Sequence, residues 1–167
     1  PNLSTSLYFI VNDQFYTKAL PNVKLNEGVI VDSLNHVAME QPELIKKYYG
    51  NLANTEKDAV TALNTMLAQD GLFIYVPKHV QLDRTVQIIN ILRSDVDLMV
   101  NRRVLIVLEE GAKAQFLFCD HAADDQNFLA TQVIEAFVGD NASLELNCME
   151  ETHAKNVRVS NVYIEQQ

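Results

Sequence analysis

The fold is indicated first by the segment Ile106–Ala114, with the sequence IVLEEGAKA, which recurs 30 residues later as Ala136–Leu144, AFVGDNASL. An earlier copy, Ile74–Leu82, has the sequence IYVPKHVQL and lies 32 residues upstream. Each copy consists of an apolar run, a polar turn and an alternating second run. Repeats of this length are typical of solenoids, propellers and other stacked arrays.

One position in the turn is the most informative, because it holds His79, Gly111 and Asn141 in the three copies. Glycine enters the left-handed backbone region freely, and Asn and His are among the few other residues enriched there. We therefore expect a positive φ at all three positions, with the residues three and five places later stacked in register. The alternative is chance agreement within a β-rich chain.

In the run after each turn, every second residue is predicted to face the interior. In a stack of coils Phe116 would therefore lie over Leu146 and Phe118 over Cys148. No long helical pattern interrupts residues 72–167, which disfavours a sheet built from βαβ units. The fold class we predict is therefore mainly β, with residues 72–167 forming the first coils of a parallel β-helix.

Residues 1–71 have a different pattern, which predicts a small α/β segment. Asn12 and Asp13 stand between two apolar runs and predict a β-hairpin. Three short helices are expected: one capped by Ser33, one beginning at Pro42, and one capped by Thr55. The third has the clearest apolar stripe, which we assign to the core; its members are Ala59, Val60, Leu63, Met66 and Leu67.

Composition excludes several classes of function. The chain has 13 basic and 22 acidic residues, a net charge of −9, so neither nucleic-acid binding nor a polybasic membrane anchor is expected. No apolar run approaches the roughly 18 residues of a membrane span. Two cysteines are too few for a disulfide scaffold, which favours a reducing, cytoplasmic setting. A start at Pro1, without Met or a signal-peptide pattern, suggests a piece of a longer chain or the remnant of a tag.

Four residues are weak candidates for metal ligation: Cys119, His121, Cys148 and His153. Thiolate and imidazole suit zinc, iron or copper, but neither a C-x-x-C nor an H-x-x-x-H spacing occurs. The predicted strand phase also places the two cysteines on opposite faces. We expect no shared metal and no disulfide between them, and we expect Cys148 to behave as a small buried hydrophobic residue.

The motifs do not indicate catalysis. Carboxylates occur as adjacent pairs, at Glu109-Glu110, Asp124-Asp125 and Glu150-Glu151, and adjacent strand residues point to opposite faces. There is no G-x-S-x-G, no P-loop and no G-x-G-x-x-G. We expect a chain that is not an enzyme and that holds no cofactor of its own.

The sequence resembles the SufB/SufD family of iron–sulfur cluster assembly proteins, and SufD more than SufB. The helix with Ala62-Leu63-Asn64, followed by the stretch Asp70–Lys78 (DGLFIYVPK), carries the resemblance most specifically. His79 is a departure, since the family usually has Gly there. Further stretches that fit the family are Glu27–Val31, Pro42–Tyr48, Arg103–Val107 and Glu109–Ala112.

The resemblance implies a right-handed parallel β-helix flanked by helical regions. It also implies a non-catalytic subunit of a cytoplasmic complex with a SufB-type scaffold and the ABC-type ATPase SufC. A SufD-like subunit is associated with iron acquisition, and SufD subunits pair through their β-helices. The family's β-helix continues beyond this chain, and the parts implicated in cluster assembly and ATPase binding lie there.

Two further expectations follow from the repeat. The next turn would fall at position 171, beyond Gln167, so the last coil is incomplete and the chain is expected to self-associate through it. The apolar residues expected on that coil are Val157, Val159, Val162 and Ile164. The alternative function is a β-helix carbohydrate-active enzyme, a lyase or hydrolase, which would normally be secreted and would gather charged groups on one strand face.

Overall fold

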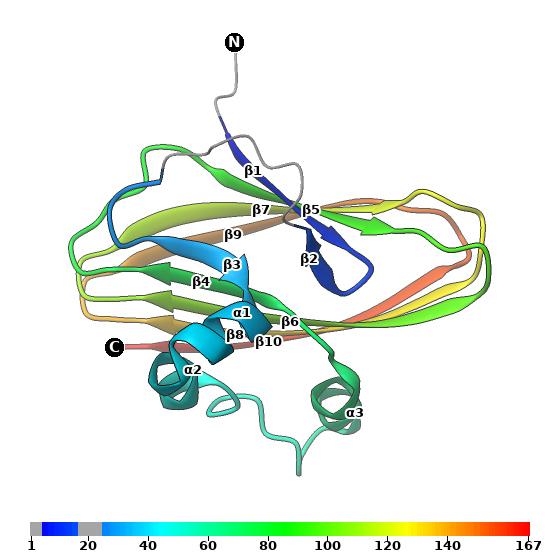
Figure 1. The fold of residues 1–167 in the computed structure, drawn as a ribbon, viewed down its shortest axis with the longest axis horizontal. Coiled ribbons are helices and arrows are strands. Elements are labelled where there is room, and N and C mark those ends of the chain that lie inside the picture. Colours follow the sequence, from blue (N-terminus) through cyan, green and yellow to red (C-terminus); the bar gives the residue numbers. More distant parts are fainter. Residues whose placement is uncertain (1–4, 17–24) are drawn as a thin grey trace.

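The computed structural model describes residues 5–16 and 25–167, which form two five-stranded sheets facing each other (Figure 1). Sheet A contains, in spatial order, β2 (Gln14–Tyr16), β1 (Ser6–Val11), β5 (Val86–Leu92), β7 (Lys113–Ala122) and β9 (Ser143–Glu151). Sheet B contains β10 (Asn156–Gln166), β8 (Phe128–Val138), β6 (Leu98–Leu108), β4 (Leu72–Val76) and β3 (Ile30–Ser33).

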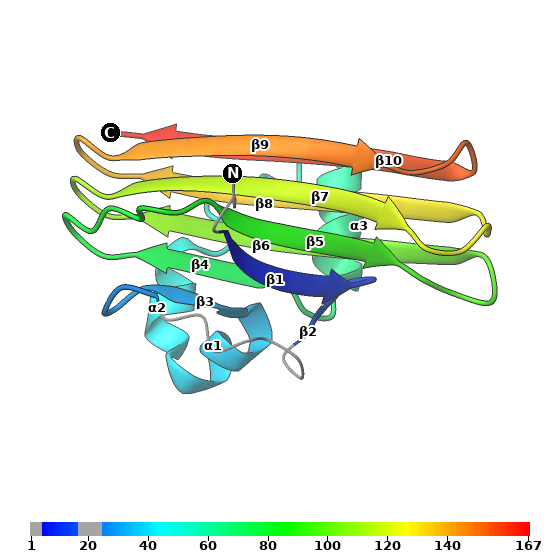
Figure 2. The ribbon, with the colours of Figure 1, turned by 90° about the horizontal axis from the view of Figure 1, so that it is seen from above.

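The chain passes from one sheet to the other once in every coil, and successive coils stack as layers (Figure 2). The coils are β4–β5, β6–β7 and β8–β9, and β10 begins another. Neighbouring strands of successive coils are parallel, with Ile74 beside Ile106 and Ile106 beside Ala136. The predicted mainly β fold and the offsets of 32 and 30 residues between copies are thus confirmed, and the fold is a parallel β-solenoid.

The recurrent turn is also confirmed. His79, Gly111 and Asn141 have φ values of 60°, 67° and 55°. The turns are joined to one another by hydrogen bonds, since the His79 N–H donates to the Glu110 carbonyl and the Gly111 N–H donates to the Asp140 carbonyl, both at 2.8 Å. In each coil, the residue with a positive φ therefore occupies the same place in the turn that precedes the second strand.

The interior column agrees with the prediction in the second and third coils, where Phe116 lies beside Leu146 and Phe118 beside Cys148. In the first coil the prediction is wrong at the fifth position after the turn. Gln81 pairs with Lys113, an offset of 32, but Val86 pairs with Phe116, an offset of 30. The loop between these pairs holds two extra residues, which shift the rest of β5 relative to the turn.

The N-terminal residues close one end of the solenoid. The predicted hairpin is present: β1 and β2 pair antiparallel around Asn12, which has a φ of 58°. β1 also pairs in parallel with β5, so it extends sheet A, and β3 pairs antiparallel with β4 at the matching edge of sheet B. The division into residues 1–71 and 72–167 stays a prediction.

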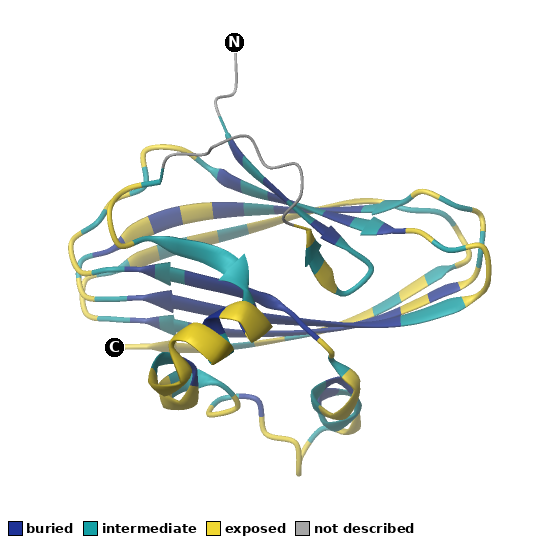
Figure 3. Cartoon of the chain, viewed as in Figure 1, coloured by how far each residue is buried: buried dark blue, intermediate teal, exposed yellow. Residues whose placement is uncertain are grey.

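Three helices, α1 (Leu34–Glu40), α2 (Pro42–Tyr48) and α3 (Ala59–Leu67), lie outside sheet B (Figure 1). The Ser33 side chain caps α1 by accepting from the His36 N–H at 3.1 Å, as the sequence predicts, and α2 begins at Pro42. Buried side chains of α1 and α2 pack on the outer face of β4 and β6; the cluster includes Leu34, Val37, Ile45, Phe73, Leu105 and Val107. The interior of the solenoid and the helix-covered face of sheet B are the buried parts of the molecule (Figure 3).

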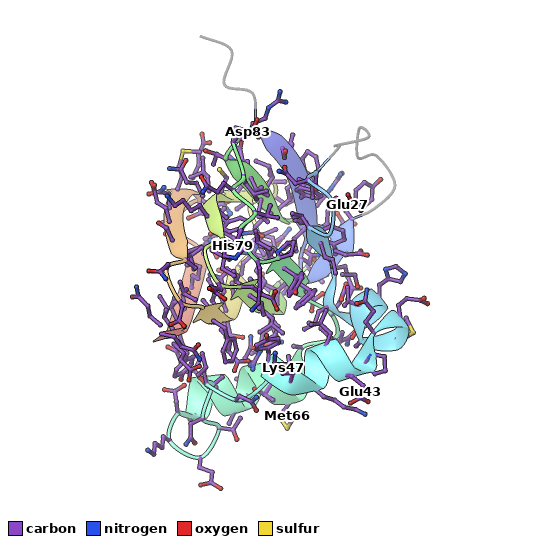
Figure 4. The ribbon with its side chains drawn as sticks, turned by 90° about the vertical axis from the view of Figure 1, so that its left-hand side faces the viewer. Glu27, Glu43, Lys47, Met66, His79 and Asp83 are labelled. Carbon is purple, nitrogen blue, oxygen red and sulfur yellow. The ribbon has the colours of Figure 1, made fainter. Side chains whose placement is uncertain are left out.

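The third helix differs from its prediction in both its start and its orientation. It begins at Ala59, and its cap is Asp58, whose carboxylate accepts from the Thr61 N–H at 2.6 Å, rather than Thr55. Its buried residues are Thr61 and Asn64, whereas Met66 in the apolar stripe is 72 % exposed and points outward (Figure 4). The assignment of the whole stripe to the core is therefore wrong.

The physical reason is that α3 rests on a polar part of sheet B. The Asn64 side chain donates hydrogen bonds to the Arg102 carbonyl at 2.9 Å and to Thr131 Oγ1 at 3.0 Å. Thr61 Oγ1 lies 2.8 Å from the Tyr163 hydroxyl on β10. Buried backbone and hydroxyl groups need such partners, so the polar face of the helix turns inward.

Candidate functional site

The two cysteines lie on opposite faces of sheet A, as predicted. Cys119 on β7 pairs with Met149, while Cys148 on β9 pairs with Phe118 in the interior column. Cys119 is fully buried, and its Sγ accepts a hydrogen bond from Gln87 Nε2 at 3.2 Å. The two thiols are both free. For these two residues to share a metal ion or a disulfide, one of the two strands would have to turn its side chains to the other face of the sheet.

Cys148 is exposed, so the prediction that it is a buried hydrophobic residue is wrong. Its phase is the interior one, but β9 is the edge strand of sheet A in the described part of the chain. Partial desolvation raises the pKa of the Cys148 thiol; the nearby Asp120 and Glu150 carboxylates raise it further, and Arg158 opposes them. A neutral thiol is a poor nucleophile and a poor metal ligand.

The two histidines among the candidates serve local contacts. His121, on β7, has Nδ1 at 3.3 Å from the Glu151 carboxylate on β9. In the turn before β10, His153 Nδ1 accepts from the Lys155 N–H at 3.2 Å, and its Nε2 lies 2.8 Å from the Asp124 carbonyl. His153 Nε2 therefore carries the proton and donates to that carbonyl, because the carbonyl can only accept.

The structure does not bring the four metal candidates together. Within residues 5–16 and 25–167, His, Cys, Asp and Glu side chains form no group of three or more that could hold a metal ion. Nor is any helix in that part of the chain long and apolar enough to cross a membrane. The candidates for metal ligation stay predictions.

A buried ionic cluster inside the solenoid was not predicted. Arg102 on β6 and Arg158 on β10 each donate from Nη1 to the carboxylate of Asp120 on β7. Arg158 also donates to Glu150 at 3.3 Å. Arg102 and Asp120 are both 2 % exposed, and burial lowers the pKa of Arg102 while Asp120 opposes that shift. Through Arg158 on β10 and Glu150 on β9, the cluster reaches the end of the solenoid that these two strands form.

Strand phase would have placed Arg102 and Asp120 in the interior of the solenoid, although it does not identify their partners. Asp120 continues the alternation of Phe116 and Phe118, and Arg102 continues that of Val104 and Ile106, so both charges face the interior. A charged residue at an interior position is the signal, because burying it requires a partner.

A second buried cluster holds the helical segment on sheet B. Arg103 donates to Glu135 at 2.6 Å, and the guanidinium carbon lies 4.7 Å from the centre of the Tyr49 ring. The Glu135 carboxylate also accepts from three backbone N–H groups at 2.9–3.0 Å, those of Gly50, Leu52 and Ala53. This loop joins α2 to α3, so one carboxylate fixes the path of the chain between them.

The end of the solenoid formed by β9 and β10, which we call the open end, presents apolar side chains at its surface. Val157, Val159, Val162 and Ile164 are exposed there, as predicted. A groove of about 320 Å³ opens between the two strands, lined in part by Leu144, Leu146 and Ile164. The interior apolar columns thus end at a surface that another coil or another chain can cover.

Comparison with known proteins agrees with this architecture. Residues 1–88 match the family model described as the SufBD protein N-terminal region. Residues 90–167 match the one described as the SUF system FeS cluster assembly, SufBD core domain.

Three relatives illustrate the similarity. The SufBD family protein slr0074 of Synechocystis sp. is 30 % identical over 129 residues, covering 77 % of this chain and 27 % of that protein. The chloroplastic SufBD family protein ABCI8 of Arabidopsis thaliana is 30 % identical over 131 residues, or 76 % and 23 %. SufD of Bacillus subtilis is 29 % identical over 129 residues, or 71 % and 28 %.

All three relatives are named as iron–sulfur cluster assembly proteins, and the chain spans about a quarter of their length. Two consecutive family models together cover nearly the whole chain. The solenoid architecture agrees with the fold that the sequence resemblance implied. The chain therefore belongs to the SufBD family of iron–sulfur cluster assembly proteins.

Proposed function

We propose that this chain forms the N-terminal segment and first coils of a SufD-like, non-catalytic subunit of an iron–sulfur cluster assembly complex. The observation that carries the proposal is the consecutive match of residues 1–88 and 90–167 to the two SufBD family models. The match to a relative named SufD supports the SufD-like role. Its partners would be a SufB-type scaffold subunit and an ABC-type ATPase of the SufC type, in the cytoplasm.

A structural role for this part of the subunit is supported by how its charged side chains are used. Arg102 and Asp120 bond to each other inside the solenoid, and Arg103 and Glu135 anchor the loop between α2 and α3. These groups hold strands and helices in place. In this proposal the iron–sulfur cluster is cargo of the whole complex, and this part of the chain carries no cofactor of its own.

In this proposal the open end is the surface through which the solenoid is extended or contacts another chain. Strands β9 and β10 present free edges and apolar side chains, including Leu146 and Val162, in the same columns as the interior residues below them. Further coils of the subunit, or a second solenoid, would continue both sheets from these edges. Pairing of two such chains through their β-helix strands is part of the proposal.

Co-purification tests the proposal. The full-length protein, tagged and co-expressed with the SufB-type and SufC-type proteins of the same organism, is expected to recover both in constant proportions. An unrelated β-helix protein with the same tag is the control. Recovery of neither partner would contradict the proposed complex.

Genetic complementation separates the SufD-like from the SufB-like role. The gene is expected to restore growth to a bacterial strain that lacks SufD, but not to a strain that lacks SufB, under conditions that demand cluster assembly. The reverse pattern would assign the SufB-like role and would contradict the finer proposal while leaving the family assignment intact.

A further inference from the structure

The interior of the solenoid is divided by a polar band. On one side lies the main apolar core, which includes Ile88 and Phe118, and on the other a smaller apolar cluster that includes Leu92 and Phe128. Between them the interior positions carry polar side chains. The residues of this band are Asn90, Arg102, Asp120, Gln132 and Arg158.

Arg102 crosses this band from one sheet to the other. It starts on β6 of sheet B, and its Nε donates to the carbonyl of Asn12, directly after β1, at 3.2 Å. Its Nη1 donates to Asp120 on β7. In sheet A, β5 lies between β1 and β7, and Asn90 on β5 is flanked by Ile10 and Asp120. The guanidinium therefore spans the level of Asn90.

Hydrogen-bond accounting leaves this place incomplete. Arg102 Nη2 and both polar atoms of the Asn90 side chain, Nδ2 and Oδ1, have no hydrogen-bond partner among residues 5–16 and 25–167. Asn90 is 1 % exposed and Arg102 is 2 % exposed. Polar atoms buried this deeply are almost always paired in native proteins, by protein groups or by ordered water.

We propose that at least one ordered water molecule binds inside the solenoid between Asn90 and Arg102. It accepts a hydrogen bond from Arg102 Nη2 and donates one to the Asn90 side chain. The Asn12 carbonyl and the Asp120 carboxylate, which bracket the guanidinium, are further acceptors. Two to four polar partners are what a buried water requires.

The charges of the band favour a neutral ligand over an ion. Arg102 and Arg158 are balanced by Asp120 and Glu150, to which they are hydrogen-bonded. An added anion would face the two carboxylates, and an added cation would face the two guanidinium groups, each at a high cost in a buried setting. Water supplies both a donor and an acceptor without changing the charge.

The site has a structural consequence for the N-terminal cap. Arg102 already ties the hairpin at Asn12 to β7, and the water would add a link to β5 at Asn90. The neighbouring strands β1, β5 and β7 would then be joined across the interior as well as by the backbone hydrogen bonds between them. This water site does not depend on the chain's proposed role in cluster assembly.

A high-resolution crystal structure of the protein is the direct test. We expect a water within hydrogen-bond distance of both Arg102 Nη2 and the Asn90 amide, and its loss in an Asn90→Leu variant. Direct bonding of Asn90 to Arg102 or Asp120, or an empty interior at this place, would overturn the proposal.

Thermal unfolding gives an independent test. If water satisfies Asn90, then Asn90→Leu leaves Arg102 Nη2 without its bridge and lowers Tm by about 2–4 °C. If the amide is truly unpaired, Leu removes a buried polar cost, and Tm is unchanged or higher. Ile88→Leu, on the same face of β5, is the matched control for repacking the interior without changing its polarity.

Discussion

Arg103 and Glu135 form an ion pair of 2.6 Å between the neighbouring strands β6 and β8, with their side chains 1 % and 0 % exposed. The pair lies on the outer face of sheet B, beneath the loop that joins α2 to α3. Glu135 uses its other hydrogen-bonding capacity on the backbone of that loop, at Gly50, Leu52 and Ala53. A single buried carboxylate therefore fixes the loop between α2 and α3 to the solenoid.

Loss of that carboxylate is expected to destabilise the protein strongly. Glu135→Gln would leave the buried Arg103 charge uncompensated, which typically costs about 3–5 kcal/mol. Urea unfolding measures the change in the free energy of unfolding. Glu145→Gln, at an exposed position on β9, is the control and is expected to change it by less than about 0.5 kcal/mol.

The same pair offers a rescue experiment. Adding Arg103→Met to Glu135→Gln removes the unpaired charge, so the double variant is expected to regain part of the lost stability. A Glu135→Gln protein that is as stable as Glu145→Gln would contradict the assignment of this pair as the anchor of the loop between α2 and α3.

Replacing Gly111 in the recurrent turn is expected to destabilise the protein for two separable reasons, backbone strain and a steric clash. Its φ is +67°, and a Cβ there would lie 2.5 Å from Nδ1 of His79 in the preceding coil. Gly50 has a similar φ of +78° but no atom within 4 Å of such a Cβ. We expect Gly50→Ala to cost about 1–2 kcal/mol from backbone strain alone, and Gly111→Ala to cost about 1–3 kcal/mol more.

Both costs can be read from urea unfolding curves. In a His79→Gly background the clash is absent, so Gly111→Ala is expected to cost no more than Gly50→Ala does in the unaltered protein. Equal losses for the two alanine variants in the presence of His79 would show that the neighbouring turn yields, against the expectation.

The open end predicts self-association of the 167-residue chain. Val162 stands in the interior column beside Ile134, yet it is 49 % exposed, because no strand covers β10. Val159 is on the outer face of the same strand. Light scattering over a concentration series is expected to show a dimer that Val162→Asp weakens and Val159→Asp leaves intact. A strict monomer at high micromolar concentration would refute this prediction.

We also predict that this chain alone retains no iron–sulfur cluster. Cys119 is buried and accepts a hydrogen bond from Gln87, while the pKa of Cys148 is raised and its side chain lies on the opposite face. After anaerobic reconstitution with iron and sulfide, followed by desalting, no visible absorption band is expected. A band that disappears in Cys119→Ser but persists in Cys148→Ser would prove the prediction wrong.

The repeat and the phase of its strands can be read from the amino-acid sequence alone. The left-handed turn at His79, Gly111 and Asn141 and the pairing of Phe116 with Leu146 could be predicted because both depend on short-range rules. One rule is the backbone conformation that each residue type tolerates, and the other is the alternation of side chains along a strand. These rules operate within a few residues, so a single sequence displays them.

What each face of a strand or helix contacts depends on the tertiary structure. Alternation assigned Cys148 to the interior, but its exposure depends on whether another strand covers β9. The burial of Thr61 in place of Met66 depends on the polar surface that sheet B presents to α3. The ion pair of Arg102 with Asp120 joins strands from opposite sheets. Each outcome is set by partners distant in sequence, and local periodicity carries no information about them.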